Sequence, residues 1–519
     1  MLVSLPGGCG AEPDGGDGDL GGDGDYGGEG EGEGEGEGEG DDNPPPEEET
    51  PADFRRPQSG RRFVYVANTV RDTVAVVDSR TLGIEIVEVG DAPFVLAAVP
   101  GREAALVLHE TLPEVGLLET EDTGTTVQRM EVQPGANRIE VAPDGRHAVV
   151  FFDPSRATDP DASEGSYQDL TVVRIADQPA SVRLTVGFHP TEVQFADEGR
   201  IAFVVTEDAL HRIVLDEVDE PAIAPSLDIG PSPPDPSLRE VVVTPDGAYA
   251  LVRVENSADV LVLDVATGDS VTVTLPSAPT DLDVSPDGRE AIAVLRESSS
   301  VVLLPLPGIT SDPLTFRTIA IPDEVFGQAV RAEDGSLLVL FTTAVPQERL
   351  VVLDLASEEW LPVPLRKTVR TVGVAPGGAT AIVIHDKLEG DPALYPDLEE
   401  RIDHEFGYSM VDLGSGFVRL QVTEVNPEPM LLYEDGRHAF LALRDDLAGV
   451  RELEAVDLAA FQVRTLQLPS PPSALGAVPD TAQAYVAQDH KSGRITFVGV
   501  ETLETQTVTG FELGAEVIQ

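Results

Sequence analysis

A tight turn, most often written Asp-Gly, recurs along most of the chain between short runs rich in valine, leucine and alanine. Examples are VAPDGRHAVVFF, VTPDGAYALVRV, VSPDGREAIAVL, RAEDGSLLVLFT and LYEDGRHAFLAL. Asp-Gly suits a two-residue hairpin because both residues tolerate a positive φ, and the twist of such a turn matches that of the flanking strands. We therefore expect an array of β-hairpins.

Ten markers of this turn give the period of the array, which averages about 47 residues and is typical of four-stranded propeller blades. The markers fall near Gly60, Gly101, Gly145, Gly199, Gly247, Gly288, Gly335, Gly378, Gly436 and Asp480. The sequence thus predicts an all-β fold, a β-propeller of four-stranded antiparallel blades with about ten repeat units. No linker interrupts the repeats, and the final TVTGFELGAEVIQ can supply a fourth strand and then the first strand that unit one lacks. This favours one ring closed by the C-terminal strand, with two smaller rings as the alternative.

The third strand of several units ends in an aspartate, as in VAVVDSRT, VLVLDVAT and LVVLDLAS. Asp78, Asp264 and Asp354 are expected to bond to the backbone of the next turn, which is a structural role. The stretch YVAN, followed by DTVAVVDSRT and VEVGDAPF, resembles the YVTN family of β-propeller repeats, found in bacterial and archaeal surface proteins and in periplasmic propeller proteins. The resemblance covers about residues 60 to 519. It implies the architecture but little about function, since propellers host enzymes and scaffolds alike.

The N-terminal segment suggests a cellular address. Cys9, the single cysteine, follows a short apolar run and two glycines in MLVSLPGGCG, which resembles the lipobox of bacterial lipoproteins. The resemblance implies that Cys9 is lipidated and that residues 1–9 are the remnant of a signal peptide. The apolar run is shorter than a signal needs, and a start assigned too far downstream accounts for this. We expect a protein anchored by lipid in the cell envelope of a bacterium, at the outer membrane or the periplasmic face.

Residues 10–58 read as a disordered acidic tether rich in glycine, glutamate and proline, and residues 59–519 as the propeller. The first 53 residues hold 18 acidic and no basic side chains, and the whole chain has a net charge of -59. Such a field repels phosphate backbones, so nucleic acid is not an expected partner. Since no apolar stretch is long enough to cross a bilayer, the lipid is the only expected contact with the membrane.

Signatures of cofactor-dependent propeller enzymes are absent from the sequence. It has no C-x-x-C-H haem motif, one tryptophan where quinoprotein dehydrogenases repeat several, and no sialidase S-x-D-x-G-x-T-W box. The eight histidines show no H-x-H or H-E-x-x-H spacing, and His147 and His438, which both follow Gly-Arg at a turn, are interpreted as ordinary surface residues. No cofactor and no metal are expected.

These observations favour a non-catalytic binding or scaffold module. The alternative is a propeller hydrolase of the lactonase-like type, because its catalytic groups would come from different blades and leave no local motif. Convergent His, Asp or Glu side chains around the central opening would favour the enzyme.

Long connections are expected to gather on one face of the ring. In a four-stranded blade, the connection between strands two and three emerges on the same side as the links between blades. Segments 153–169 and 386–408 fall between strands two and three, 228–239 links two blades, and only 305–313 is long on the other side. Because repeat scaffolds usually keep insertions where binding happens, the elaborated face is the predicted recognition surface for a protein, peptide or glycan ligand.

Five residues are the predicted ligand contacts. Tyr395, His404 and Tyr408 lie in 386–408, which is rich in aromatic residues for this chain, and its PDLEERIDHEF is expected to form a short helix capping the channel. His490 and Arg494 lie in the loop of YVAQDHKSGRITF, where they suit a small anion or a peptide carboxylate. The alternative there is a plain turn in which Arg494 pairs with neighbouring acids.

Overall fold

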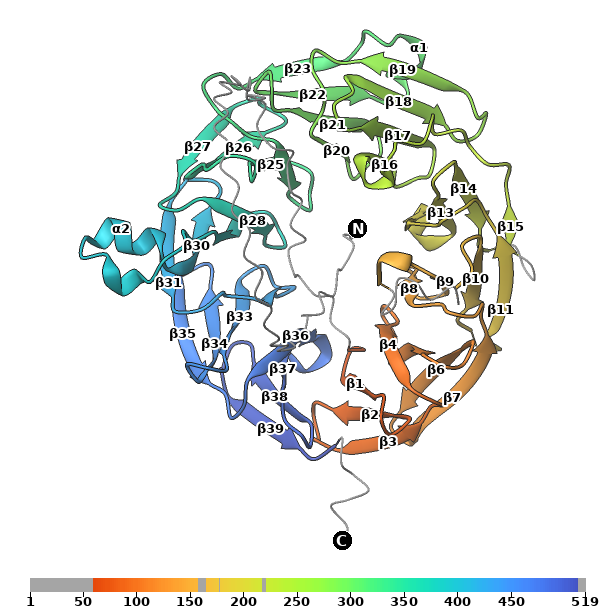
Figure 1. Cartoon of the computed structure of the whole chain (residues 1–519), viewed down its shortest axis with the longest axis vertical. Helices are drawn as coiled ribbons and strands as arrows, with labels where there is room; N and C mark the ends of the chain where they lie inside the picture. The colour runs from red at the N-terminus through yellow and green to blue at the C-terminus, as the bar shows by residue number, and fades with distance from the viewer. Residues whose placement is uncertain (1–58, 157–164, 177, 217–220, 512–519) are drawn as a thin grey trace, which may run out of the picture.

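Ten antiparallel sheets stand in a ring around a central opening (Figure 1). The computed structural model describes residues 59–156, 165–176, 178–216 and 221–511. Within each sheet the strands follow one another in sequence order, with the first strand at the opening and the last at the rim. The chain is therefore an all-β, ten-bladed propeller. The prediction of one ring is confirmed, and the alternative of two smaller rings is wrong.

Among the described residues, blade 1 has three strands and each other blade has four. The strands of blades 1 to 5 are β1 (Phe63–Asn68), β2 (Thr73–Asp78), β3 (Ile84–Glu88); β4 (Pro93–Ala98), β5 (Ala104–His109), β6 (Glu114–Glu121), β7 (Gly124–Glu131); β8 (Arg138–Val141), β9 (His147–Phe151), β10 (Asp169–Arg174), β11 (Ala180–Thr185); β12 (Glu192–Ala196), β13 (Ile201–Val205), β14 (Leu210–Val214), β15 (Ala222–Ile223); β16 (Arg239–Val243), β17 (Tyr249–Val254), β18 (Asp259–Asp264) and β19 (Ser270–Thr274).

The strands of blades 6 to 10 are β20 (Asp281–Val284), β21 (Glu290–Leu295), β22 (Ser300–Pro305), β23 (Arg317–Ala320); β24 (Gln328–Arg331), β25 (Leu337–Phe341), β26 (Arg349–Asp354), β27 (Trp360–Pro364); β28 (Val369–Val374), β29 (Thr380–His385), β30 (Phe406–Asp412), β31 (Val418–Thr423); β32 (Met430–Leu432), β33 (His438–Asp445), β34 (Val450–Asp457), β35 (Gln462–Gln467); β36 (Pro472–Val478), β37 (Gln483–Gln488), β38 (Arg494–Gly499) and β39 (Thr505–Thr509). The connections contain two short α-helices, α1 (Gly308–Ser311) and α2 (Leu398–Asp403), and single 3₁₀ turns at Pro154–Arg156, Asp197–Gly199, Pro236–Leu238, Pro392–Leu394 and Pro479–Thr481.

The aspartates at turns and strand ends hold the hairpins, as the sequence predicts. In the Asp-Gly turn of blade 5, Gly247 has a φ of 70° and the Asp246 carboxylate accepts from the amide of Ala248 at 3.0 Å. At the end of the third strand, Asp264 accepts from the amides of Ala266 and Thr267 at 2.9 and 3.0 Å. Asp78 and Asp354 accept in the same way from amides two residues further on. These side chains satisfy backbone groups that the turns leave unpaired.

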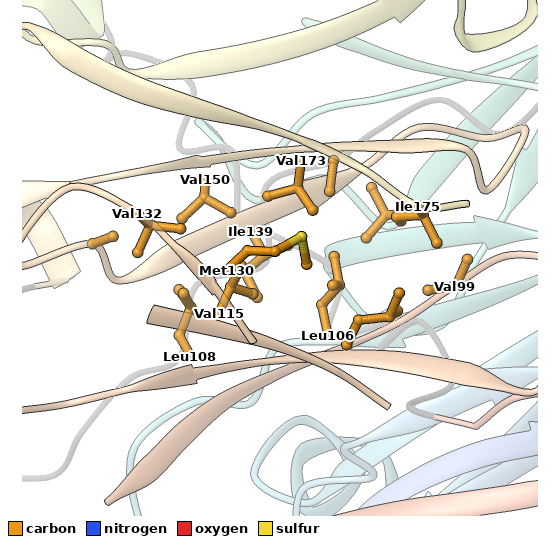
Figure 2. Packing of buried hydrophobic residues seen from close by; sticks show 14 of the residues in the cluster. Val99, Leu106, Leu108, Val115, Met130, Val132, Ile139, Val150, Val173 and Ile175 are labelled. Atoms are coloured by element: carbon orange, nitrogen blue, oxygen red, sulfur yellow. The ribbon is translucent and has the colours of Figure 1, made fainter. Parts of the chain in front are cut away.

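Each interface between neighbouring blades has its own apolar cluster. Figure 2 shows the cluster between blades 2 and 3, in which Leu106 and Val115 of one sheet face Val150 and Val173 of the next. Alternate residues of each strand point to opposite faces of its sheet, so a central strand is apolar on both faces and serves two interfaces. The core is therefore a ring of ten similar clusters.

The interface between blades 10 and 1 closes the ring. Blade 1 begins at the second-strand position, since β2 ends in Asp78 as the third strands of blades 5 and 7 end in Asp264 and Asp354. Ser59 forms a single bridge with Val64 at the place of the missing innermost strand. β39 is the fourth strand of blade 10, as predicted, whereas the expected pairing of the last residues with blade 1 lies outside the described residues.

The long connections obey the predicted parity. Segment 153–169 joins β9 to β10, segment 386–408 joins β29 to β30, and 228–239 links blades 4 and 5, whereas 305–313 lies between β22 and β23. We call the side that carries the first three the insert-bearing face and the other side the opposite face. Within the described ranges, no helix has the length and hydrophobicity needed to cross a bilayer.

Candidate functional site

Polar side chains on the innermost strands connect neighbouring blades. Gln194 of β12 bridges to β16, because its Oε1 accepts from the Val243 amide at 2.9 Å and its Nε2 donates to the Val241 carbonyl at 2.5 Å. The Asp281 carboxylate of β20 accepts from the Ala329 amide of β24 at 2.7 Å. These contacts satisfy backbone groups at the inner edges of the sheets.

The charges on these strands are also paired locally. Asp283 of β20 lies 3.3 Å from Arg331 of β24. Burial raises the pKa of Asp283 above its usual value, and the arginine opposes this shift. In blade 3, Arg138 bonds to Glu140 at 2.9 Å and to Asp153 at 3.1 Å. Groups that neutralise each other in this way are held as structural pairs.

Segment 386–408 is held in place by buried contacts of its own. The ammonium of Lys367, which is buried, donates to the carbonyls of Ile402 and Asp403 at the C-terminus of α2, at 2.7 and 3.2 Å. The negative end of the helix dipole favours a cation there. The rings of Tyr395 and His404 stack at 3.7 Å between centroids, so these two predicted contacts hold the segment together.

Among the side chains that segment 386–408 exposes, the large apolar ones are leucines. Leu388, Leu394 and Leu398 are 58%, 74% and 68% exposed. The predicted helix forms as α2, with the Asp397 carboxylate accepting from the Glu399 amide at its N-terminus at 2.9 Å. Figure 1 shows α2 projecting outward beyond the rim of the ring, so the prediction that it caps the channel is wrong.

Tyr408 belongs to the core, so its prediction as a ligand contact is wrong. It is the third residue of β30, is completely buried, and donates from its hydroxyl to the Glu454 carboxylate of blade 9 at 2.8 Å. Burial raises the pKa of both groups, because each is shielded from water in its charged form. The sequence places Tyr408 beside the insert, but the strand begins at Phe406 and takes Tyr408 inside.

A cavity of about 520 Å³ opens on the insert-bearing face between blades 9 and 10. Its lining is Arg444, Asp445, Asp446, Gly449, Val450, Arg451, Pro471 and Asp489. Arg444 is 2.6 Å from each of Asp446 and Asp489. A cavity of this size suits a small ligand or a peptide segment, and walls with both signs of charge suit a ligand that also carries both.

His490 lies in the connection that begins with Asp489, beside this cavity, and Arg494 is the first residue of β38, which follows that connection. The Nδ1 atom of His490 accepts from the Ser492 amide at 3.2 Å. Arg494 donates to the hydroxyls of Ser470 and Thr509 at 3.0 and 3.1 Å, and not to the neighbouring acids of the alternative interpretation. Its guanidinium group is therefore bonded to two uncharged hydroxyls.

An aromatic cluster on the same face was missed in the sequence. Tyr167 stacks on Phe188, with centroids 5.8 Å apart and planes at 14°, and meets Phe152 edge-on at 5.4 Å. Phe188 is 46% exposed, and the neighbouring His189 bonds through Nδ1 to Glu207 at 2.7 Å. These residues come from one insert, one link between blades and one hairpin, so no local pattern joins them.

The interpretation of His147 and His438 as ordinary surface residues is wrong. Both are buried, with 6% and 8% exposure, because they are the first residues of β9 and β33 and point between blades. The Nδ1 atom of His438 lies 2.6 Å from the Asp435 carboxylate. Burial lowers the pKa of His147, and nearby Asp144 and Asp216 oppose this shift.

Comparison with known proteins finds resemblances among solved structures. No family model and no curated protein matches the chain. One solved structure that resembles it is the dihydro-heme d1 dehydrogenase NirN, at 14% identity over 66% of this chain and 71% of that one, with a TM-score of 0.42. Another is a eukaryotic initiation factor, at 10% identity over 78% of this chain and 96% of that one, with a TM-score of 0.49. The Swd1 β-propeller domain from Myceliophteria thermophila has 14% identity over 62% of this chain and 97% of that one, with a TM-score of 0.32.

Identities and TM-scores this low carry no argument about activity. The fold and its surface therefore define the class: a ten-bladed β-propeller whose inserts, mixed-charge cavity and aromatic cluster share one face.

Proposed function

We propose that the chain is a non-catalytic binding module that recognises a protein or peptide partner through its insert-bearing face. One observation carries the proposal, namely that large apolar side chains are exposed at two places on that face. Leu388, Leu394 and Leu398 stand on one insert, and Phe188 stands with Tyr167 on another side of the ring. Exposed apolar groups with polar surroundings are typical of surfaces that bind other proteins.

The net charge of the chain limits the classes of partner that can bind. With 93 acidic and 34 basic residues, the protein attracts positively charged surfaces and repels nucleic acid and anionic lipid headgroups. A partner with basic residues around an apolar contact fits both properties. The hydrolase alternative gains no support from the inner strands, where Asp283, Arg331 and Asp281 are engaged between blades.

Photo-crosslinking tests which face binds. A benzoylphenylalanine placed at Leu394, which is 74% exposed on the insert-bearing face, should give covalent adducts with a protein in the source cells. The matched control is Leu314, which is 80% exposed between β22 and β23 on the opposite face. Replacing Leu394 and Leu398 together by aspartate should weaken binding of the crosslinked partner about tenfold or more, because desolvated apolar contacts dominate such interfaces.

The Leu314→Asp variant should bind as the parent does. Adducts formed only from position 314 would contradict the assignment of the face. Adducts from position 394 that are removed by a glycosidase and not by a protease would make the ligand a glycan and overturn the protein partner.

We further propose that a lipid on Cys9 holds this module at the cell envelope, with residues 10–58 as the tether. Both segments lie outside the described residues, and the proposal rests on the lone cysteine in its lipobox-like context. Cys9→Ser, introduced at the native locus, should move nearly all of the protein from the membrane to the soluble fraction. Each buried methylene of a lipid chain adds to membrane affinity, and serine has no thiol to accept a thioether-linked lipid. Unchanged fractionation would refute the anchor.

A further inference from the structure

We propose that blades 9 and 10 bind a divalent transition metal ion of the zinc type between Asp435, His438 and Glu501. One ligand atom from each of these three side chains lies within 4.8 Å of the other two. Among the described residues they form the one group of three or more such side chains with this geometry. The group lies on the opposite face, away from the proposed recognition surface, so it is independent of that function.

The first two ligands are fixed by the turn between β32 and β33. The Asp435 carboxylate accepts from the amides of Arg437 and His438 at 2.9 and 3.0 Å. Gly436 has a φ of 65°, and a Cβ there would lie 2.1 Å from the Pro376 carbonyl oxygen, so only glycine permits this turn. The turn is therefore held in place before any ion binds.

His438 already lies beside its fellow ligand Asp435. It is only 8% exposed, and its Nδ1 lies 2.6 Å from the Asp435 carboxylate. A metal ion binds the deprotonated forms of these groups, so an ion that takes the place of the shared proton meets the ring nitrogen and the carboxylate together. Both groups then act as ligands after a small rotation.

The third ligand comes from the neighbouring blade. Glu501 lies in the turn between β38 and β39, and its side chain is 67% exposed. Two ligands that are each about 2.1 Å from an ion are at most about 4.2 Å apart, so a modest rotation of Glu501 closes the observed distance. An ion held in this way would connect blade 9 to blade 10.

The donor set selects the class of metal. One imidazole nitrogen with two carboxylate oxygens is a set that zinc and its neighbours in the first transition row accept, whereas calcium and magnesium prefer oxygen alone. Arg437 is the competing cation, at 3.8 Å from Glu501 and 2.9 Å from Asp457. The pair with Glu501 is exposed and weak, so an ion can displace it.

Blade 3 provides an internal control. The same four residues, Asp-Gly-Arg-His, occur there as 144–147, and His147 is equally buried. Its Nδ1 has no hydrogen-bond partner, and Asp144 does not hold it as Asp435 holds His438. A general affinity of such turns for metal would appear at both positions, whereas the proposed site exists only at His438.

The test is a titration of the untagged, metal-free full chain with zinc chloride by calorimetry, with the melting temperature followed in parallel. We expect one strong site per chain and a rise in melting temperature, because an ion that binds only the folded state stabilises it. His438→Ala should weaken binding by about a hundredfold and Glu501→Gln by about tenfold, whereas His147→Ala should leave it unchanged. Arg437→Ala should tighten it.

Glu501→Gln is exposed and of the same size, so it keeps the fold even if His438→Ala does not, and circular dichroism checks both. Binding that survives Glu501→Gln and His438→Ala, or that falls equally in His147→Ala, would overturn the site. The absence of strong zinc binding in the parent would do the same. Calcium bound more tightly than zinc at these residues would overturn the assigned class of metal.

Discussion

Phe497→Ala is expected to lower the free energy of unfolding by about 3–5 kcal/mol and to open the ring between blades 10 and 1. Phe497 of β38 is completely buried and packs in the cluster that Val64, Ala75 and Val77 of blade 1 form with blade 10. Removing its ring leaves a cavity that the surrounding strands fill only in part, and the lost contacts lie at the closing interface.

The closing interface differs from the other nine because no covalent link crosses it. Its polar contacts include the Ser59 hydroxyl donating to the Ala477 carbonyl, the Asp480 amide with the Arg61 carbonyl at 2.9 Å, the exposed ion pair of the Arg61 and Asp480 side chains at 2.7 Å, and Ser79 with Thr481 at 3.1 Å. Exposed ion pairs add little to stability, so the apolar cluster must carry the closure.

The matched control is Phe440→Ala. Phe440 of β33 is also completely buried, but it packs between blades 9 and 10, which the chain itself connects. Both variants should lose similar stability in urea unfolding. Only Phe497→Ala should speed amide hydrogen exchange in β1, β2 and β38 under native conditions, because local opening at the closing interface exposes those strands first.

Equal rates of hydrogen exchange in the two variants would contradict the prediction that the closing interface opens while the rest of the ring stays folded. Deleting residues 511–519 should act in the same direction as Phe497→Ala, since Phe511 is buried in the same cluster. A truncated chain as stable as the parent would show that Phe511 contributes nothing to the closure.

Most of the architecture was predictable because it depends on short-range sequence patterns. Asp-Gly turns, terminal aspartates and alternating valines each act within a few residues, and their period alone gave about ten units. The parity of the inserts follows from the same count, since it depends only on which strands a connection joins.

The site was less predictable because its contacts cross blades. Tyr408 was misplaced because the sequence does not show where the insert ends and β30 begins. Tyr167 and Phe188 meet only after two connections fold over the same face, and Glu501 reaches His438 from another blade. Such contacts depend on the register between sheets, which no local pattern specifies.

The parent chain is expected to lose about 3 kcal/mol of stability between pH 6.5 and pH 4 through His385 alone. His385, at the end of β29, is 1% exposed, with Nδ1 3.0 Å from the Thr368 carbonyl and Nε2 2.7 Å from the Ser409 hydroxyl. Burial, with a smaller contribution from Lys367, lowers its pKa from 6.5 to about 4, although the bond to Thr368 opposes the shift.

The direction of the effect follows from where the proton binds. In the unfolded chain His385 takes up a proton near pH 6.5, whereas the folded chain resists this until about pH 4. Protonation therefore favours the unfolded state. The stability that the neutral imidazole provides is complete above pH 6.5, falls as the pH is lowered through the window, and reaches its lowest value below pH 4.

Urea unfolding of the parent and of His385→Gln at several pH values between 7 and 4 measures this contribution. Glutamine does not titrate, so the difference in unfolding free energy between the two proteins should shrink by about 3 kcal/mol across the window, while other histidines and carboxylates cancel. Parallel curves would mean that His385 is protonated as easily in the folded chain as in water.

The same change should reach segment 386–408. The amide of Asp386, the residue after His385, donates to the Thr368 carbonyl at 3.2 Å, and loss of this hydrogen bond when His385 is protonated should loosen the base of the segment first. Acid would then weaken the proposed recognition surface before it unfolds the ring.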